Sequence, residues 1–193
     1  MVANGLIFVN FVGLKKQEML FKETRRKKAL KEVDNERFIK YYALPEVRSL
    51  GFLFNINDND ILDTIKRLIE IIDSRSIKFS AIAINDSKHP YPKEYLDHRI
   101  IIINKSDFNC IGIPKTNFIE EFTDQNFNLY IDFSCLYSFT CDYISKRSRA
   151  SFKVGRIHYL NTPFDLVLDN LKEESSRGFL NSIIHYLSSI KSV

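Results

Sequence analysis

The sequence predicts an α/β protein: a single Rossmann-like, three-layer domain with a mainly parallel sheet of five to six strands, preceded by an extra basic helix. Short unbroken apolar runs alternate with stretches whose apolar residues recur at helical spacing. Apolar runs without alternation are typical of parallel strands buried on both faces. The chain has 193 residues, 45% hydrophobic and 27% charged, which is the size and composition of one ordinary globular domain.

The N-terminal part predicts a helix that is not part of the domain core. Residues 12–33 lack Pro and are rich in Lys, Glu, Leu and Arg, which favours a helix. Their apolar positions form no single stripe, so we expect this helix to dock only partly on the domain or to project from it. A linker with Pro45 follows. We therefore assign a basic helical arm and linker to residues 1–46 and the α/β domain to residues 47–193.

Strands and helices then alternate along the domain. The first strand is expected at residues 50–54, with Asp58 as the N-cap of the next helix. That helix is the clearest periodic signal, with Ile61, Leu62, Ile65, Leu68, Ile69 and Ile72 at offsets 0, 1, 4, 7, 8 and 11. Further strands are expected at residues 79–84, 100–103, 129–133, 151–154 and 166–168. Further helices are expected near residues 118–122, 136–149 and 179–190.

Polar residues follow several of these strands. In an open parallel sheet, ligands bind in the crevice outside the carboxyl ends of the strands. The candidate ligand-binding residues at those ends are Asn55, Asp58, Asp86, Asp132, Ser134 and Arg156. Asn, Asp and Ser are also the residues that turns and helix caps require, so each has an ordinary structural alternative.

The motifs of several well-defined chemistries are missing from the sequence. It has neither G-x-G-x-x-G nor G-x-x-x-x-G-K-[ST], which argues against NAD-dependent and P-loop enzymes. The four histidines are far apart, and Cys135 and Cys141 are six residues apart, so we predict no metal site and no cofactor. Cys135 lies at an expected helix N-terminus, which can activate a thiol, but no base is identifiable beside it. We assign no catalytic residue, and whether the chain is an enzyme stays open.

The positive charge is concentrated in one segment. Eight basic and two acidic residues between Lys15 and Lys31 give this segment +6, which leaves −2 for the rest of a chain whose net charge is +4. The basic residues are Lys15, Lys16, Lys22, Arg25, Arg26, Lys27, Lys28 and Lys31. They favour an anionic partner: RNA, an acidic protein, or a membrane surface with help from apolar residues 6–12. The ordinary alternative is a solvated helix face.

Cysteine usage and the first residues predict a soluble cytoplasmic protein. An odd number of cysteines, three, argues against a disulfide framework and suits a reducing compartment. The apolar run near the start is too short to span a bilayer, and the lysines come after it, unlike in a secretory signal. The abundance of Ile, Lys, Asn and Phe is typical of an AT-rich bacterial genome.

From the first strand onward, the chain resembles a family of short bacterial proteins with a domain of unknown function. The resemblance is carried by LGFLF at residues 50–54, DFNCIGIP at 107–114, FNLYIDFS at 127–134 and ASFKVGR at 150–156. It covers about residues 15–190 and implies a cytoplasmic α/β protein with no known activity or site. LYID at 129–132 and FKVGR at 152–156 also resemble one half of heptosyltransferase-like glycosyltransferases. That likeness implies the sheet and not the activity, because those enzymes need two such domains.

We therefore expect a non-catalytic binding or interaction module that docks to an anionic partner through its basic N-terminal helix. The alternative is a small-ligand binder or enzyme, for a nucleotide or a sugar, that uses the crevice at the strand carboxyl ends.

Overall fold

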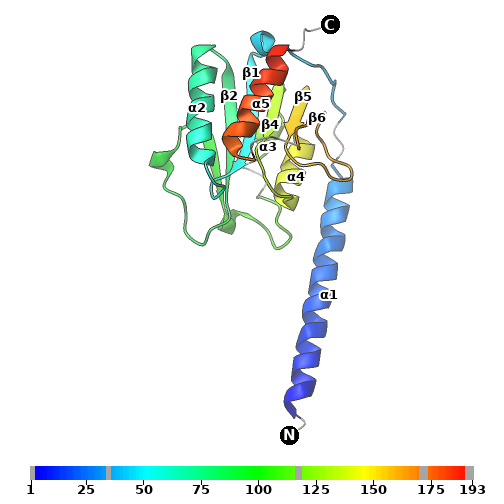
Figure 1. Cartoon of the computed structure of the whole chain (residues 1–193). Coiled ribbons are helices and arrows are strands. Elements are labelled where there is room, and N and C mark those ends of the chain that lie inside the picture. The colour runs from blue at the N-terminus through cyan, green and yellow to red at the C-terminus, as the bar shows by residue number, and fades with distance from the viewer. Residues whose placement is uncertain (1–2, 34–35, 116–118, 170–173, 190–193) are drawn as a thin grey trace.

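A computed structural model describes residues 3–33, 36–115, 119–169 and 174–189. Its strands are β1 (Ser49–Asn55), β2 (Lys78–Asn85), β3 (Ile100–Asn104), β4 (Leu129–Asp132), β5 (Phe152–Gly155) and β6 (Leu166–Val167). Over the described ranges they form one six-stranded sheet in the order β3-β2-β1-β4-β5-β6, and all neighbours pair in parallel (Figure 1). The predicted Rossmann-like parallel sheet is confirmed.

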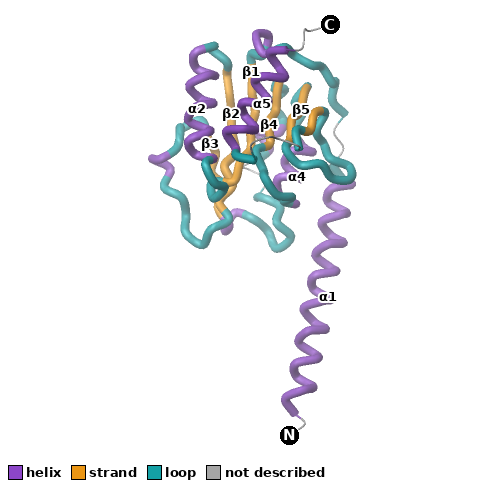
Figure 2. Tube along the Cα trace, viewed as in Figure 1, coloured by secondary structure: helices purple, strands orange, loops and turns teal. Residues whose placement is uncertain are grey.

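Helices cover both faces of this sheet (Figure 2). They are α1 (Ala3–Lys31), α2 (Ile61–Ser74), α3 (Glu120–Thr123), α4 (Phe139–Arg147) and α5 (Ser176–Ser189). The core residues of α2 and α5 belong to one apolar cluster, and those of α3 and α4 belong to the other. Among the described residues, we find no helix with the length and apolar character that crossing a membrane requires.

The central strand explains why both layers of helices are needed. Phe52, Leu53 and Phe54 of β1 are completely buried although consecutive side chains point to opposite faces. Phe52 and Phe54 pack in the cluster with α2 and α5, and Leu53 packs in the cluster with α3 and α4. A strand with no polar face is stable in a soluble protein only if helices cover both faces of the sheet.

The segment after α1 is attached to the β5–β6 side of the sheet. Arg37 donates to the carbonyl oxygens of Ala150 and Ser151, both at 3.1 Å, and to the Asp165 carboxylate at 2.6 Å. The side chains of Arg37 and Asp165 are each only 12% exposed, so this ion pair is largely shielded from water. These contacts fix the position from which α1 leaves the domain.

The expected starts of α2 and α4 are wrong, and α1 begins at Ala3 and not near residue 12. The N-cap of α2 is Asp60 and not Asp58, because a turn from Asn55 to Asp58, closed by a 3.2 Å backbone hydrogen bond, precedes the helix. The Asp60 carboxylate accepts hydrogen bonds from the backbone N–H groups of Ser176 and Arg177, at 3.1 and 3.0 Å, and so caps α5 instead of its own helix.

The second wrong start concerns α4. This helix begins at Phe139, because the hydroxyl of Ser138 accepts from the backbone N–H of Cys141 and caps it. Leu136, which we expected on its core face, therefore lies in the preceding loop and is 78% exposed. Phe118 and Ile190, which were expected in helices, lie outside the described residues.

A buried lysine holds the other end of α4. Lys153 of β5 is 1% exposed, and its ammonium donates to the carbonyl oxygens of Ser145 at 2.7 Å and Lys146 at 3.4 Å. These carbonyls belong to the last turn of α4, where a cation complements the helix dipole. Burial, together with the nearby Arg37 guanidinium, nevertheless lowers the pKa of Lys153 from 10.5 to about 7.

This pKa predicts how stability depends on pH. Between about pH 7 and 10.5 the unfolded chain binds a proton at Lys153 that the folded chain has released, so the free energy of unfolding rises with pH. We expect a rise of about 2 kcal/mol between pH 7 and about pH 8.5, measured by urea unfolding, and a flatter profile for Lys153→Met. Parallel profiles for the two proteins would contradict a lowered pKa at Lys153.

Candidate functional site

A crevice of about 720 Å³ opens at the carboxyl ends of the strands, between β1 and β4. It lies where the strand order reverses, because the chain runs outward from β1 to β3 and then returns to place β4 on the other side of β1. In doubly wound sheets this switch point is where ligands bind. The loop after β1, the loop after β2, the segment after β3, the start of α4 and one face of α1 line the crevice.

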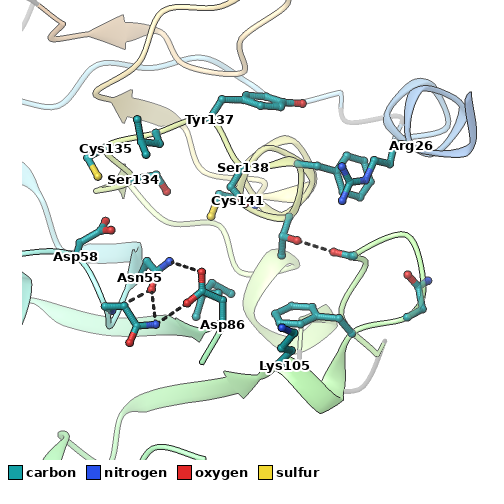
Figure 3. A pocket seen from close by; sticks show the side chains of 18 of the residues that line it. Arg26, Asn55, Asp58, Asp86, Lys105, Ser134, Cys135, Tyr137, Ser138 and Cys141 are labelled. Carbon is teal, nitrogen blue, oxygen red and sulfur yellow. Dashed lines mark hydrogen bonds between the residues drawn. The ribbon is translucent and has the colours of Figure 1, made fainter. Parts of the chain in front are cut away.

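One side of the crevice is acidic and rich in amides (Figure 3). Asn57 donates to one oxygen of the Asp86 carboxylate at 2.5 Å, and Asn55 donates to the other at 3.3 Å. The carboxylate is thus oriented by two amides while Asp86 stays exposed, so its oxygens can accept further hydrogen bonds. Burial raises the pKa of Asp58, and the neighbouring negative charge of Asp86 raises it further.

The strand β4 ends in a buried polar residue beside the crevice. Asp132 is 3% exposed, and its carboxylate accepts from the backbone N–H of Ser134 and the hydroxyl of Ser145, both at 2.9 Å. The Ser145 hydroxyl also shares a 2.8 Å hydrogen bond with Tyr130. Burial raises the pKa of Asp132. Its oxygens are therefore used inside the protein, and its role is to fix the end of β4.

Ser134 differs from Asp132. It is 8% exposed and lines the crevice, and among the described residues its hydroxyl forms no well-aligned hydrogen bond. The hydroxyl interacts with the Asp132 carboxylate and the Cys141 thiol, and it opposes the rise that burial causes in the pKa of each. A polar ligand in the crevice would offer it a further partner.

The other side of the crevice is basic and comes from distant parts of the chain. Lys22 and Arg26 of α1 line it, whereas Lys105 directly follows β3, whose last residue Asn104 pairs with Asn85 beside Asp86. The Arg26 guanidinium donates to the Ile111 carbonyl oxygen at 2.8 Å and lies over the Phe139 ring, 4.7 Å from its centroid. Arg26 therefore attaches α1 to the domain beside the crevice (Figure 3).

The start of α4 lies between the acidic and basic sides. Residues 138–141 line the crevice, and three of them, Ser138, Thr140 and Cys141, carry small hydroxyl or thiol groups. The N-terminus of a helix carries partial positive charge and unsatisfied N–H groups, which favour an anion. At the neighbouring helix α2, by contrast, Asp58 and Asp60 stand at the N-terminus and oppose an anion there.

The candidate residues of the sequence are thus brought together only in part. Asn55, Asp58, Asp86 and Ser134 line the crevice as expected. Asp132 and Arg156 instead line a small recess of about 10 Å³ beside it, together with Tyr159. Arg156 donates to the backbone carbonyl of Glu174.

A second carboxylate, Asp142, marks this recess. It is 3% exposed and accepts hydrogen bonds from the hydroxyls of Tyr159 at 3.0 Å and Tyr137 at 3.4 Å. Burial raises the pKa of Asp142, and the ammonium of Lys146, at 3.7 Å, opposes that shift. Since its oxygens are occupied by protein groups, Asp142 is part of the support of α4 and not of the crevice.

The idea of Cys135 as a nucleophile is not supported. The residue lies in the loop before α4 and not at the helix N-terminus. Burial and the negative charge of Asp58 raise the pKa of its thiol, which keeps the thiol protonated. Among the described residues, no cluster of His, Cys, Asp and Glu has the arrangement of a metal site.

The structure does not bring all eight basic residues of the N-terminal segment to the crevice. Only Lys22 and Arg26 of the eight line the crevice, and the side chains of Lys15 and Lys16 lie outside the described residues. Sequence reasoning missed Lys105 and the contribution of α1 to the crevice. A contact between Arg26 and Ile111 spans 85 residues and leaves no local pattern in the sequence.

Comparison with known proteins identifies a family. A family model described as "Family of unknown function (DUF6913)" matches residues 18–190. No curated protein and no solved structure matches the chain. The resemblance to half of a heptosyltransferase-like enzyme thus finds no support.

The Arg26 contacts predict which residue holds α1 in place. Arg26→Ala removes the hydrogen bond to Ile111 and the contact with Phe139, so we expect faster amide hydrogen exchange in residues 22–31 and 109–113. Arg25→Ala is the matched control, because the Arg25 side chain lies over Phe21 of the same helix. Equal exchange in both variants would show that Arg26 does not attach the helix.

Proposed function

Because the chain belongs to this family of unknown function (DUF6913), we propose its role from its own residues: it binds a small phosphorylated ligand with hydroxyl groups, a nucleotide or a sugar phosphate, in the crevice. The observation that carries the proposal is the separation of charge at the switch point. Asp58 and Asp86 are on one side, Lys22 and Arg26 of α1 are on the other, and the N-terminus of α4 lies between them.

The acidic side suits hydroxyl groups. Carboxylates accept hydrogen bonds from hydroxyls, and both oxygens of Asp86 are already oriented by Asn55 and Asn57. In dinucleotide-binding sheets of this strand order, an acidic residue about 20 residues beyond the glycine motif binds ribose hydroxyls. Asp86 directly follows β2 and faces the loop after β1, which favours the same role.

The phosphate has a different place from that in a dinucleotide site. The loop from Asn55 to Asp60 contains no glycine and has acidic residues at positions 58 and 60, so a pyrophosphate at the start of α2 would meet negative charge. The start of α4, with Ser134, Lys22 and Lys105 nearby, offers N–H and ammonium donors instead. Among the described residues no histidine lines the crevice, and we propose binding without assigning a reaction.

A thermal-shift screen of nucleotides and sugar phosphates tests this proposal. A ligand at 100 times its dissociation constant stabilises the folded state by about 2.7 kcal/mol, which gives a clear shift. We expect Asp86→Asn to weaken the best ligand about tenfold, because a hydrogen bond to a charged group contributes about 1.5–3 kcal/mol. Asp63→Asn is the control, since Asp63 is exposed on α2 and does not line the crevice.

A second variant separates the two ends of the ligand. Lys22→Gln should reduce the preference for the phosphorylated form over the unphosphorylated one, while Asp86→Asn should weaken both. The proposal is wrong if no compound shifts the melting temperature, or if Asp86→Asn and Asp63→Asn bind equally well.

We also propose that the outer face of α1 binds an anionic partner. Arg25, Lys27, Lys28 and Lys31 are exposed and do not line the crevice. Among the described residues, Lys28 forms an ion pair with Glu32 at 3.6 Å, and both side chains are largely exposed. Such surface pairs are weak, so these cations remain available to a partner.

Retention on heparin tests the outer face of α1. The triple variant Lys27→Gln, Lys28→Gln, Lys31→Gln should elute at a lower salt concentration than the unchanged protein, because fewer cations contact the polyanion. The control triple Lys66→Gln, Lys88→Gln, Lys93→Gln changes the net charge equally at exposed positions elsewhere. If the two variants elute at the same salt concentration, net charge alone explains the retention, and the outer face of α1 is not a specific binding surface.

For the location of the chain we propose the cytoplasm. All three cysteines are free thiols, and Cys110 and Cys135 are exposed. Exposed free thiols suit a reducing compartment.

A further inference from the structure

The polarity of α1 changes along its axis and not around it. Residues 3–14 contain no charged residue, whereas residues 15–31 contain eight basic and two acidic ones. Apolar positions form no stripe along one side of the helix, so it is not the kind of helix that lies flat on a surface. Its two ends are suited to different environments.

The domain holds only the basic end. Ala29, Leu30 and Val33 pack against the core cluster of α4, and Arg26 bonds to Ile111. Farther toward the N-terminus, Met19, Leu20 and Phe21 are 63%, 59% and 61% exposed. Figure 1 shows that the rest of the helix runs clear of the domain. An isolated helix is marginal in water, so this part needs a partner.

The length of the uncharged part fits one leaflet of a bilayer. Its 12 residues span about 18 Å at 1.5 Å per residue. Half of a hydrocarbon core of about 30 Å is about 15 Å. Residues 3–14 can therefore reach into the hydrocarbon of one leaflet, while the lysines from Lys15 onward stay at the level of the headgroups.

From this we infer that α1 inserts its N-terminal end into one leaflet of an anionic phospholipid bilayer and binds the headgroups through its basic segment. This inference rests on the second proposal above, that α1 binds an anionic partner. Lysine and arginine side chains near an anionic surface are attracted to it, and their contributions add along the segment. A second copy of α1 is a poorer partner, because each copy carries +6 between Lys15 and Lys31 and the two would repel.

This arrangement orients the crevice. Lys22 lines the crevice, and α1 continues from there toward its N-terminus, away from the domain. Lys15 lies seven residues before Lys22, about 10 Å along the helix. The carboxyl ends of the strands lie on the side of the domain from which α1 projects (Figure 1). The crevice would open toward the headgroups.

Fluorescence of the full chain tests the inference, because the chain contains no Trp. Phe8→Trp places a single indole in the uncharged end. With vesicles that contain phosphatidylglycerol we expect a blue shift of its emission and quenching by lipids labelled in the acyl chain. The protein should bind vesicles of pure phosphatidylcholine at least about tenfold more weakly.

A variant pair separates this inference from the proposal on which it rests. Phe8→Asp with Phe11→Asp should abolish vesicle binding and leave heparin retention nearly unchanged. Phe38→Asp with Leu160→Asp is the control, since these side chains are 81% and 89% exposed and neither belongs to α1. If the unchanged protein binds heparin or RNA but not the vesicles, the membrane inference alone is overturned. If the unchanged protein binds neither, the proposal of an anionic partner is overturned as well.

Discussion

The burial of β1 on both faces, over residues 50–54, is the constraint on which the rest of the structure depends. A strand with no polar face requires helices on both sides of the sheet, and the chain supplies them by reaching β2 and β4 on opposite sides of β1. The helix that follows β1 belongs to one apolar cluster, and the helix that follows β4 belongs to the other. Because α2 and α4 diverge in this way, the carboxyl ends of β1 and β4 cannot be covered by either helix. The crevice is therefore a consequence of how the core is buried.

Hydrogen-bond partners decide which polar residues serve the fold and which are free for a ligand. Asp132, Asp142 and Lys153 are buried, and their polar atoms bond to hydroxyls and carbonyls of the protein itself. Changing them would disturb β4, α4 and β5 before it affected any ligand. Asp86 is exposed and held by two amides, and the Ser134 hydroxyl forms no well-aligned hydrogen bond among the described residues. Both residues line the crevice and can offer further hydrogen bonds to a ligand.

The elements were largely predictable, and the site only in part. Apolar runs and the 3.6-residue period identify strands and helices because the buried side of each element must be apolar along its own length. Leu50 to Phe54 and Ile61 to Ile72 are examples. The start of α2 was missed where its N-cap residue Asp60 is drawn to the start of α5, 116 residues away, whereas the start of α4 depends on a local cap, Ser138. Asn55, Asp58, Asp86 and Ser134 followed from strand order, since carboxyl ends of parallel strands share one edge. Lys22 and Arg26 did not, because only the packing of α1 against α4 brings them there, and Lys105 was overlooked although it directly follows β3.

The docked part of α1 joins the two proposed activities. A ligand that contacts Lys22 stabilises the position in which α1 lies against the crevice, and Arg26 holds that position through Ile111 and Phe139. By thermodynamic linkage, whatever stabilises that position also raises the affinity for the ligand, by the same factor. An anionic surface that binds the exposed cations of α1 acts on the same helix from its other side. Binding of the anionic surface raises the affinity for the ligand if the surface favours the docked position of α1, and lowers it if the surface favours the released position. The Arg26 contacts oppose release of α1 from the domain.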